Sequence, residues 1–173
     1  LTPHAYADDT QIYGFCPPSE ADQLCEKMSA CIDEVSAWMA ANRLLMNDSK
    51  TEVLWCSSLR RQNQIPTGSV RIGKSQVQPV RSVRDLGVLL DADVTFKTHV
   101  TATVRACFAA LRRIRSVRRC LPRPCPLTLI RALVITKLDY CNSVLAGTPM
   151  YLQQRLQSVL NAAARLVFSA RRS

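Results

Sequence analysis

Two patterns that would place a sequence in a common class of protein are missing from this one. No stretch approaches the roughly eighteen consecutive apolar residues of a membrane span, so we expect no membrane partner. None of the eight cysteines forms a CxxC pair and the two histidines stand alone, which disfavours a zinc site. Several cysteines fall instead at apolar positions of helical patterns, where a reduced thiol packs as a small hydrophobe. We therefore expect a reducing, intracellular setting, nuclear or cytoplasmic.

Acidic residues are nearly missing from the second part of the chain. Residues 97–173 contain 14 lysines and arginines and 1 acidic residue, Asp139, whereas residues 1–96 contain 9 basic and 12 acidic residues. The net charge of +10 therefore originates in the C-terminal half. A field of that size attracts a polyanion, and the phosphate backbone of a nucleic acid is the commonest one inside cells.

Hydrophobic periodicity predicts an α+β fold in two parts. Residues 1–95 read as short antiparallel strands around one helix, and residues 96–173 as an all-helical region. Apolar residues recur at three- and four-residue steps, which predicts helices over 19–41, 97–118, 126–145 and from Leu152 to Val167.

Strand patterns occur only in the first part. We expect one hairpin over residues 3–15 and a second over 70–80, around a Gly-Lys-Ser turn. A single apolar strand is expected over 83–91, and another follows the turn at 44–50, with Lys50 at its start. On local sequence alone, Lys50 reads as an ordinary surface lysine.

The adjacent carboxylates of Asp8 and Asp9 fall at the expected tip of the first hairpin. Like charges side by side repel each other, which is unfavourable unless a cation neutralises them, and divalent cations that prefer oxygen ligands would do so. Aspartate is also an ordinary turn residue. The pair therefore indicates either a metal site or a solvated turn.

Five arginines crowd the end of the helix expected over 97–118. Cations suit the C-terminus of a helix because they interact favourably with its dipole, but that explains one or two of them. The remainder favours a surface that binds phosphates. The five are Arg112, Arg113, Arg115, Arg118 and Arg119.

The order of these features resembles the second half of a reverse transcriptase palm followed by its thumb, and most closely that of LINE-type non-LTR retrotransposon reverse transcriptases. The segment Tyr6-Ala7-Asp8-Asp9-Thr10-Gln11 is similar to their catalytic motif C. Trp38 with Asn42, and then Leu45-Met46-Asn47-Asp48-Ser49-Lys50-Thr51-Glu52, is similar to motif D. Leu86-Gly87-Val88 resembles the primer-grip motif E, and Lys137-Leu138-Asp139-Tyr140-Cys141-Asn142 with Leu156-Gln157 resembles the thumb region.

The resemblance implies an RNA-directed DNA polymerase that uses two Mg²⁺ ions, an RNA template, a DNA primer and dNTP. Asp8 and Asp9 would be catalytic metal ligands, Asp8 directly and Asp9 in an assisting or orienting role. Lys50 would protonate the leaving pyrophosphate or stabilise its charge. Leu86 and Gly87 would position the primer terminus, because a glycine lets nucleic acid approach the backbone.

Under this resemblance, residues 1–95 are the C-terminal part of the palm and residues 96–173 a basic thumb. The arginines from Arg112 to Arg119 would then grip phosphates without reading sequence.

The family's active site also takes an aspartate from an upstream strand, motif A, and a dNTP-contacting segment, motif B. Because this chain begins at Leu1, a few residues before motif C, we expect an excised piece that is inactive alone and binds Mg²⁺ at most weakly. The alternative is a non-catalytic nucleic-acid-binding module in which Asp8 and Asp9 are a relic.

Overall fold

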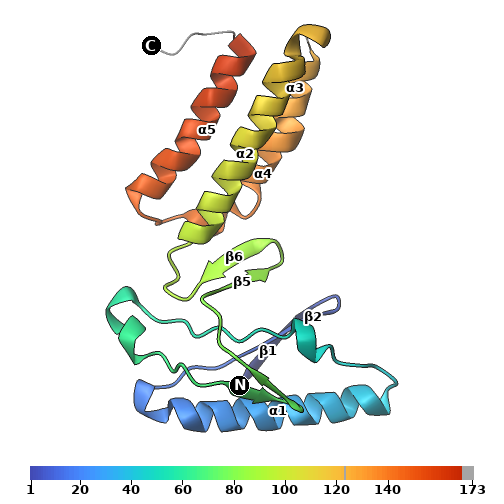
Figure 1. Ribbon diagram of the computed structural model, residues 1–173, viewed down its shortest axis with the longest axis vertical. Helices are drawn as coiled ribbons and strands as arrows, with labels where there is room; N and C mark the ends of the chain where they lie inside the picture. The colour runs from blue at the N-terminus through green and yellow to red at the C-terminus, as the bar shows by residue number, and fades with distance from the viewer. Residues whose placement is uncertain (123, 169–173) are drawn as a thin grey trace. The chain divides into compact units, whose positions relative to one another are not determined.

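The computed structural model describes residues 1–122 and 124–168 and confirms an α+β fold. The chain divides into two compact units, Leu1–Val83 and Arg84–Ser173. The strands of the described residues pair into three separate two-stranded sheets, and the long helices supply the packing surfaces (Figure 1). No helix in the same ranges is long and apolar enough to cross a membrane.

The first unit begins with the hairpin expected from the sequence. Strand β1 (Thr2–Tyr6) pairs antiparallel with β2 (Asp9–Tyr13), and the register sets Tyr6 opposite Asp9. The connection is the two-residue turn Ala7–Asp8, in which Ala7 has φ of 54°. Tight hairpin turns require such left-handed backbone, because it matches the twist of the paired strands. Every residue of β1 is exposed, so the hairpin is held mainly by backbone pairing.

Helix α1 packs on a second hairpin. After the 3₁₀ turn η1 (Pro18–Glu20), α1 (Ala21–Ala41) lies against β3 (Val70–Ile72), which pairs antiparallel with β4 (Ser75–Val77). The helix expected over 19–41 and the hairpin expected over 70–80 are both confirmed. The buried side chains of this packing are Leu24 and Ile32 from the helix and Val70 and Ile72 from the strand.

Two expectations for the first unit are wrong. The strand expected after Lys50 does not form. This segment pairs with its neighbour at one point, an isolated parallel bridge between Leu54 and Val80. Lys50 therefore stands at the end of a 3₁₀ turn, η2 (Asp48–Lys50), and not at the start of a strand. The helical spacing of residues 19–41 also predicts that Trp38 lies on the buried stripe of α1, but its side chain is 61% exposed.

The second unit opens with a further hairpin where a single strand was expected over 83–91. Strands β5 (Ser82–Asp85) and β6 (Val88–Asp91) pair with each other, and Leu86 and Gly87 form the turn between them. The φ angles of these two residues are 43° and 89°. Left-handed backbone at both central positions is typical of a two-residue hairpin turn. Apolar residues on both sides of Leu86 made the segment resemble one continuous strand in the sequence, so the turn was not predicted.

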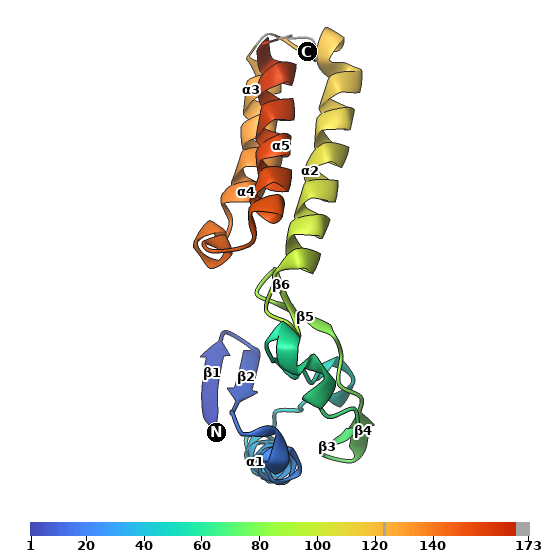
Figure 2. The same cartoon turned by 90° about the vertical axis from the view of Figure 1, so that its left-hand side faces the viewer.

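Helix α2 (Lys97–Val117) is the central element of the helical bundle. Helix α5 (Met150–Phe168) and the segments from α3 to α4 run beside it (Figure 2). The helices expected over 97–118 and from Leu152 to Val167 are confirmed. Five of the described side chains at the centre of the bundle are fully buried, namely Val100, Cys107, Val134, Leu152 and Val159.

The regular helix expected over 126–145 is wrong in its middle and at its end. The chain forms α3 (Cys125–Ile130), a π-helical segment η5 (Arg131–Ile135) and a short α4 (Thr136–Asp139). The wide π turn leaves Val134 in the core, and Thr136 Oγ1 donates to the Arg131 carbonyl at 3.0 Å. The 3₁₀ turn η6 (Asn142–Leu145) then follows.

The boundary between the two compact units falls within β5, between Val83 and Arg84, whereas the sequence predicts a division between residues 95 and 96. Strand β6 lies in contact with α2, so the hairpin belongs with the helices that follow it. The assignment of the two parts to palm and thumb stays a prediction.

Candidate functional site

Asp8 and Asp9 lie where the sequence predicts, at the tip of the β1–β2 hairpin. Asp8 is the second residue of the turn, and Asp9 is the first residue of β2. Both are exposed. Because both residues are exposed, both carboxylates are open to a ligand from solvent.

The carboxylates fit a divalent cation in kind but not in number. Carboxylate oxygens are the ligands that Mg²⁺ prefers in proteins. However, no group of three or more histidine, cysteine, aspartate or glutamate side chains is placed to hold a metal ion within the described ranges. Asp8 and Asp9 therefore suit part of a metal site that needs at least one further ligand.

Lys50 is exposed at the end of η2. Its backbone N–H donates to the Asn47 carbonyl at 3.0 Å, and Ser49 Oγ donates to Asn47 Oδ1 at 2.6 Å. These bonds define a compact turn, at whose end Lys50 is exposed to solvent. Within the part of the chain that the structure describes, no ion pair joins Lys50 to Asp8 or Asp9. The predicted action of Lys50 on the leaving pyrophosphate stays a prediction.

The Leu86–Gly87 turn is fixed to α2 through the far end of its hairpin. The Leu89 N–H donates to His99 Nδ1 at 3.3 Å, and Asp91 Oδ2 accepts from the Thr98 N–H at 3.0 Å, which satisfies a free amide in the first turn of α2. Asp91 and His99 are both buried. One hydrogen bond is donated by β6 to α2 and the other by α2 to β6, so the hairpin and the helix hold one another in place.

These two anchoring residues were missed by sequence reasoning. Asp91 follows an apolar strand and precedes a helix, a position at which a carboxylate can cap the helix. His99 follows the same three- and four-residue spacing as the buried residues of α2. The pattern could have indicated a buried histidine, but nothing local identifies Leu89 as the group bonded to it.

The predicted arginine cluster lies at the end of α2 and in the 3₁₀ turn η4 (Arg118–Cys120). Leu111 and Ile114 turn inward, and the arginines between them and after them stay in solvent. Among the described residues, no salt bridge is formed by Arg112, Arg113, Arg115 or Arg119. The exposed members are Arg112, Arg113, Arg115 and Arg119, whereas Arg118 is half-buried.

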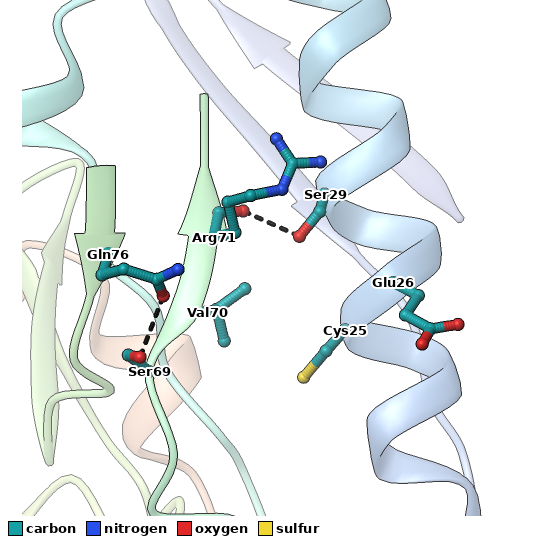
Figure 3. A pocket seen from close by; sticks show the side chains of 7 residues that line it. All are labelled: Cys25, Glu26, Ser29, Ser69, Val70, Arg71 and Gln76. Atoms are coloured by element: carbon teal, nitrogen blue, oxygen red, sulfur yellow. Dashed lines mark hydrogen bonds between the residues drawn. The ribbon is translucent and has the colours of Figure 1, made fainter. Parts of the chain in front are cut away.

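A shallow groove of about 330 Å³ lies between α1 and the β3–β4 hairpin and contains none of the predicted site residues (Figure 3). Its polar groups bind one another: Ser29 Oγ donates to the Arg71 carbonyl at 2.7 Å, and Ser69 Oγ to Gln76 Oε1 at 2.9 Å. Burial, followed by the charges of Asp22 and Cys16, raises the pKa of the Cys25 thiol on its wall, which disfavours a reactive thiolate. The groove therefore offers no catalytic chemistry of its own.

No protein-family model, curated protein or solved structure matches this chain.

The buried His99 makes stability depend on pH. Burial lowers the pKa of His99 below its ordinary 6.5, although the nearby Asp91 charge opposes this effect. As pH falls through 6.5, the unfolded chain binds a proton before the folded chain does, so the free energy of unfolding decreases. The loss is complete below the folded pKa and cannot exceed about 1.4 kcal/mol per pH unit for one group.

Urea unfolding followed by circular dichroism, at pH 7.5 and at successively lower pH, measures this decrease. His99→Gln keeps an acceptor for the Leu89 N–H but cannot titrate, so we expect a smaller pH dependence. His4→Gln is the matched control, because His4 lies exposed on β1. An unchanged pH dependence in His99→Gln would contradict the assignment.

Proposed function

We propose that this chain supplies part of the polymerase domain of an RNA-directed DNA polymerase of the LINE-type non-LTR retrotransposon class. The observation that carries the proposal is the position of Asp8 and Asp9, open to solvent at the tip of a two-residue hairpin turn. The ordered resemblance to motifs C, D and E supports it. So does the concentration of exposed arginines at the end of α2.

Asp8 and Asp9 would hold part of a magnesium site, with Asp8 as a direct ligand. When bound, Mg²⁺ supplies charge neutralisation for phosphate oxygens and lowers the cost of forming the attacking alkoxide. Because the described residues provide two suitable carboxylates, a further ligand must come from elsewhere in the functional polymerase. We therefore expect the isolated chain to be inactive in nucleotide addition.

The remaining site residues would act on the nucleic acid and on the leaving group. Lys50, exposed and on a short ordered turn, would stabilise or protonate pyrophosphate. Leu86 and Gly87 would position the primer terminus. The arginines at the end of α2 would contact phosphates and hold a primer–template hybrid without regard to its sequence.

A nucleic-acid-binding module without catalysis is the second candidate function. Two observations favour it: the metal site is incomplete among the described residues, and the second unit carries an exposed basic surface. The two candidates differ in what Asp8 does, since only the polymerase requires its carboxylate.

Primer extension separates the two candidates. A version of the chain extended upstream to include a further strand with an aspartate should incorporate dNTP on an RNA template with Mg²⁺. Asp8→Asn should lower its rate by more than about 100-fold, since losing a partner that merely orients a metal ligand already costs about 10- to 100-fold. Asp22→Asn, an exposed carboxylate of α1, is the matched control and should leave the rate unchanged. Activity that survives Asp8→Asn would refute the catalytic assignment.

Salt titration tests the phosphate-binding surface in the chain as it is. Replacing Arg112, Arg115 and Arg119 with alanine should weaken binding to a primer–template hybrid and reduce the slope of log K against log salt by about 2 to 3, since each lost phosphate contact removes about 0.7 to 0.9. The matched control replaces the exposed Arg60, Arg61 and Lys74, which removes the same net charge from the first unit. Equal slopes for both variants would mean that net charge alone drives binding.

A further inference from the structure

Tyr140 connects two segments that the sequence marks separately. It belongs to the Leu138-Asp139-Tyr140-Cys141-Asn142 stretch that follows α4, and its hydroxyl donates a hydrogen bond to the carbonyl oxygen of Leu86 in the β5–β6 turn. The two residues are 54 positions apart in the chain. The end of the α4 segment is therefore tied directly to the tip of the hairpin.

The aromatic ring of Tyr140 also covers Gly87. A Cβ built on Gly87 would lie 3.4 Å from Tyr140 Cε1 and 3.8 Å from Cζ. Gly87 has φ of 89°, a backbone conformation that other residues adopt only with strain. Glycine is thus favoured by the backbone of the turn, and the ring lies at ordinary contact distance from the position that a Cβ would take.

The backbone around Tyr140 is shaped to project this side chain. The Tyr140 N–H still donates to the Thr136 carbonyl at 3.1 Å, and the chain then leaves the helix because Cys141 has φ of 54°. Asn142 Nδ2 donates to Asp139 Oδ1 at 2.8 Å, which closes the turn on both sides of Tyr140. Leu138 packs against the core of the bundle before the turn. The residues from Leu138 to Asn142 therefore all contribute to the turn that holds Tyr140.

The location of the contact gives it a functional meaning. The far end of the β5–β6 hairpin is fixed to α2 by His99 and Asp91, and its turn, 38% exposed at Leu86, is fixed by the Tyr140 hydroxyl. A hairpin held at both ends has one orientation on the helices. A hairpin held only at its base can bend.

We propose that Tyr140 is a positioning residue that fixes the Leu86–Gly87 turn on the helical unit, so that the turn presents one fixed surface to the end of a primer strand. The inference rests on the proposed polymerase function, since that function gives the turn its primer. Tyr140 acts through Leu86 and Gly87 and needs no contact with the reacting atoms.

Nuclear magnetic resonance of the full chain labelled at its five glycines tests the contact without nucleic acid. The α-protons of Gly87 lie beside the Tyr140 ring and should show a ring-current shift. Tyr140→Phe keeps the ring but loses the hydroxyl, so this shift should shrink. An ordinary hydrogen bond lost from such a turn should increase its open population by about fivefold. Tyr151→Phe, a half-exposed tyrosine of α5, should leave Gly87 unchanged.

Binding of two hybrids tests the positioning role. The wild-type chain should prefer a hybrid with a recessed primer 3′ end over a blunt hybrid of equal length. Tyr140→Phe should reduce this preference several-fold and leave the salt slope unchanged, because no phosphate contact is lost. Tyr151→Phe should keep the preference.

The outcomes distinguish the inference from the function on which it rests. An unchanged Gly87 signal in Tyr140→Phe would overturn the contact itself. A shifted Gly87 signal with an unchanged preference for the recessed end would overturn the positioning role and leave the polymerase function standing. No preference in the wild-type chain would count against the proposed function, and the positioning role would fail with it while the contact remained.

Discussion

The arrangement of the second unit depends on the burial of one face of helix α2. Val100 and Cys107 are fully buried on that face, and the helices that cover it leave the opposite face to solvent. The inward turn of Leu111 and Ile114 is therefore the reason that the arginines around them are exposed. The same helix receives the β5–β6 hairpin at its first turn through Asp91 and His99. One apolar stripe thus fixes both the basic surface and the base of the hairpin.

Local patterns predicted the elements whose shape is set by neighbouring residues. The Ala7–Asp8 turn needed only alternating strands on either side, and α1, α2 and α5 needed only their helical spacing. Patterns failed where the chain reverses within an apolar run, as at Leu86, or where a strand has no partner, as after Lys50. Periodicity reports which side of a segment is buried, and it carries no information about whether another segment is present to pair with it.

The candidate site shows the same division. Asp8, Asp9 and the arginines could be identified from the sequence because adjacent carboxylates and crowded cations are local features. Asp91, His99 and Tyr140 could not, because their partners lie 7, 10 and 54 residues away and depend on tertiary packing. The residues that sequence reasoning missed are those that hold the site in position rather than those expected to contact the substrate. Whether a residue holds a site in position depends on tertiary contacts, so the sequence of a single segment gives little indication of it.

The most direct measurement of the central claim is a crosslink from the end of the primer. A primer–template hybrid carrying a photoreactive nucleotide at the primer 3′ terminus would be bound to the chain, irradiated and mapped by mass spectrometry. If Asp8 and Asp9 belong to a polymerase active site, the crosslinks will fall on the β1–β2 hairpin at Tyr6 to Asp9. Crosslinks confined to the segment from Arg112 to Arg119 would contradict that account and assign the chain to nucleic-acid binding alone.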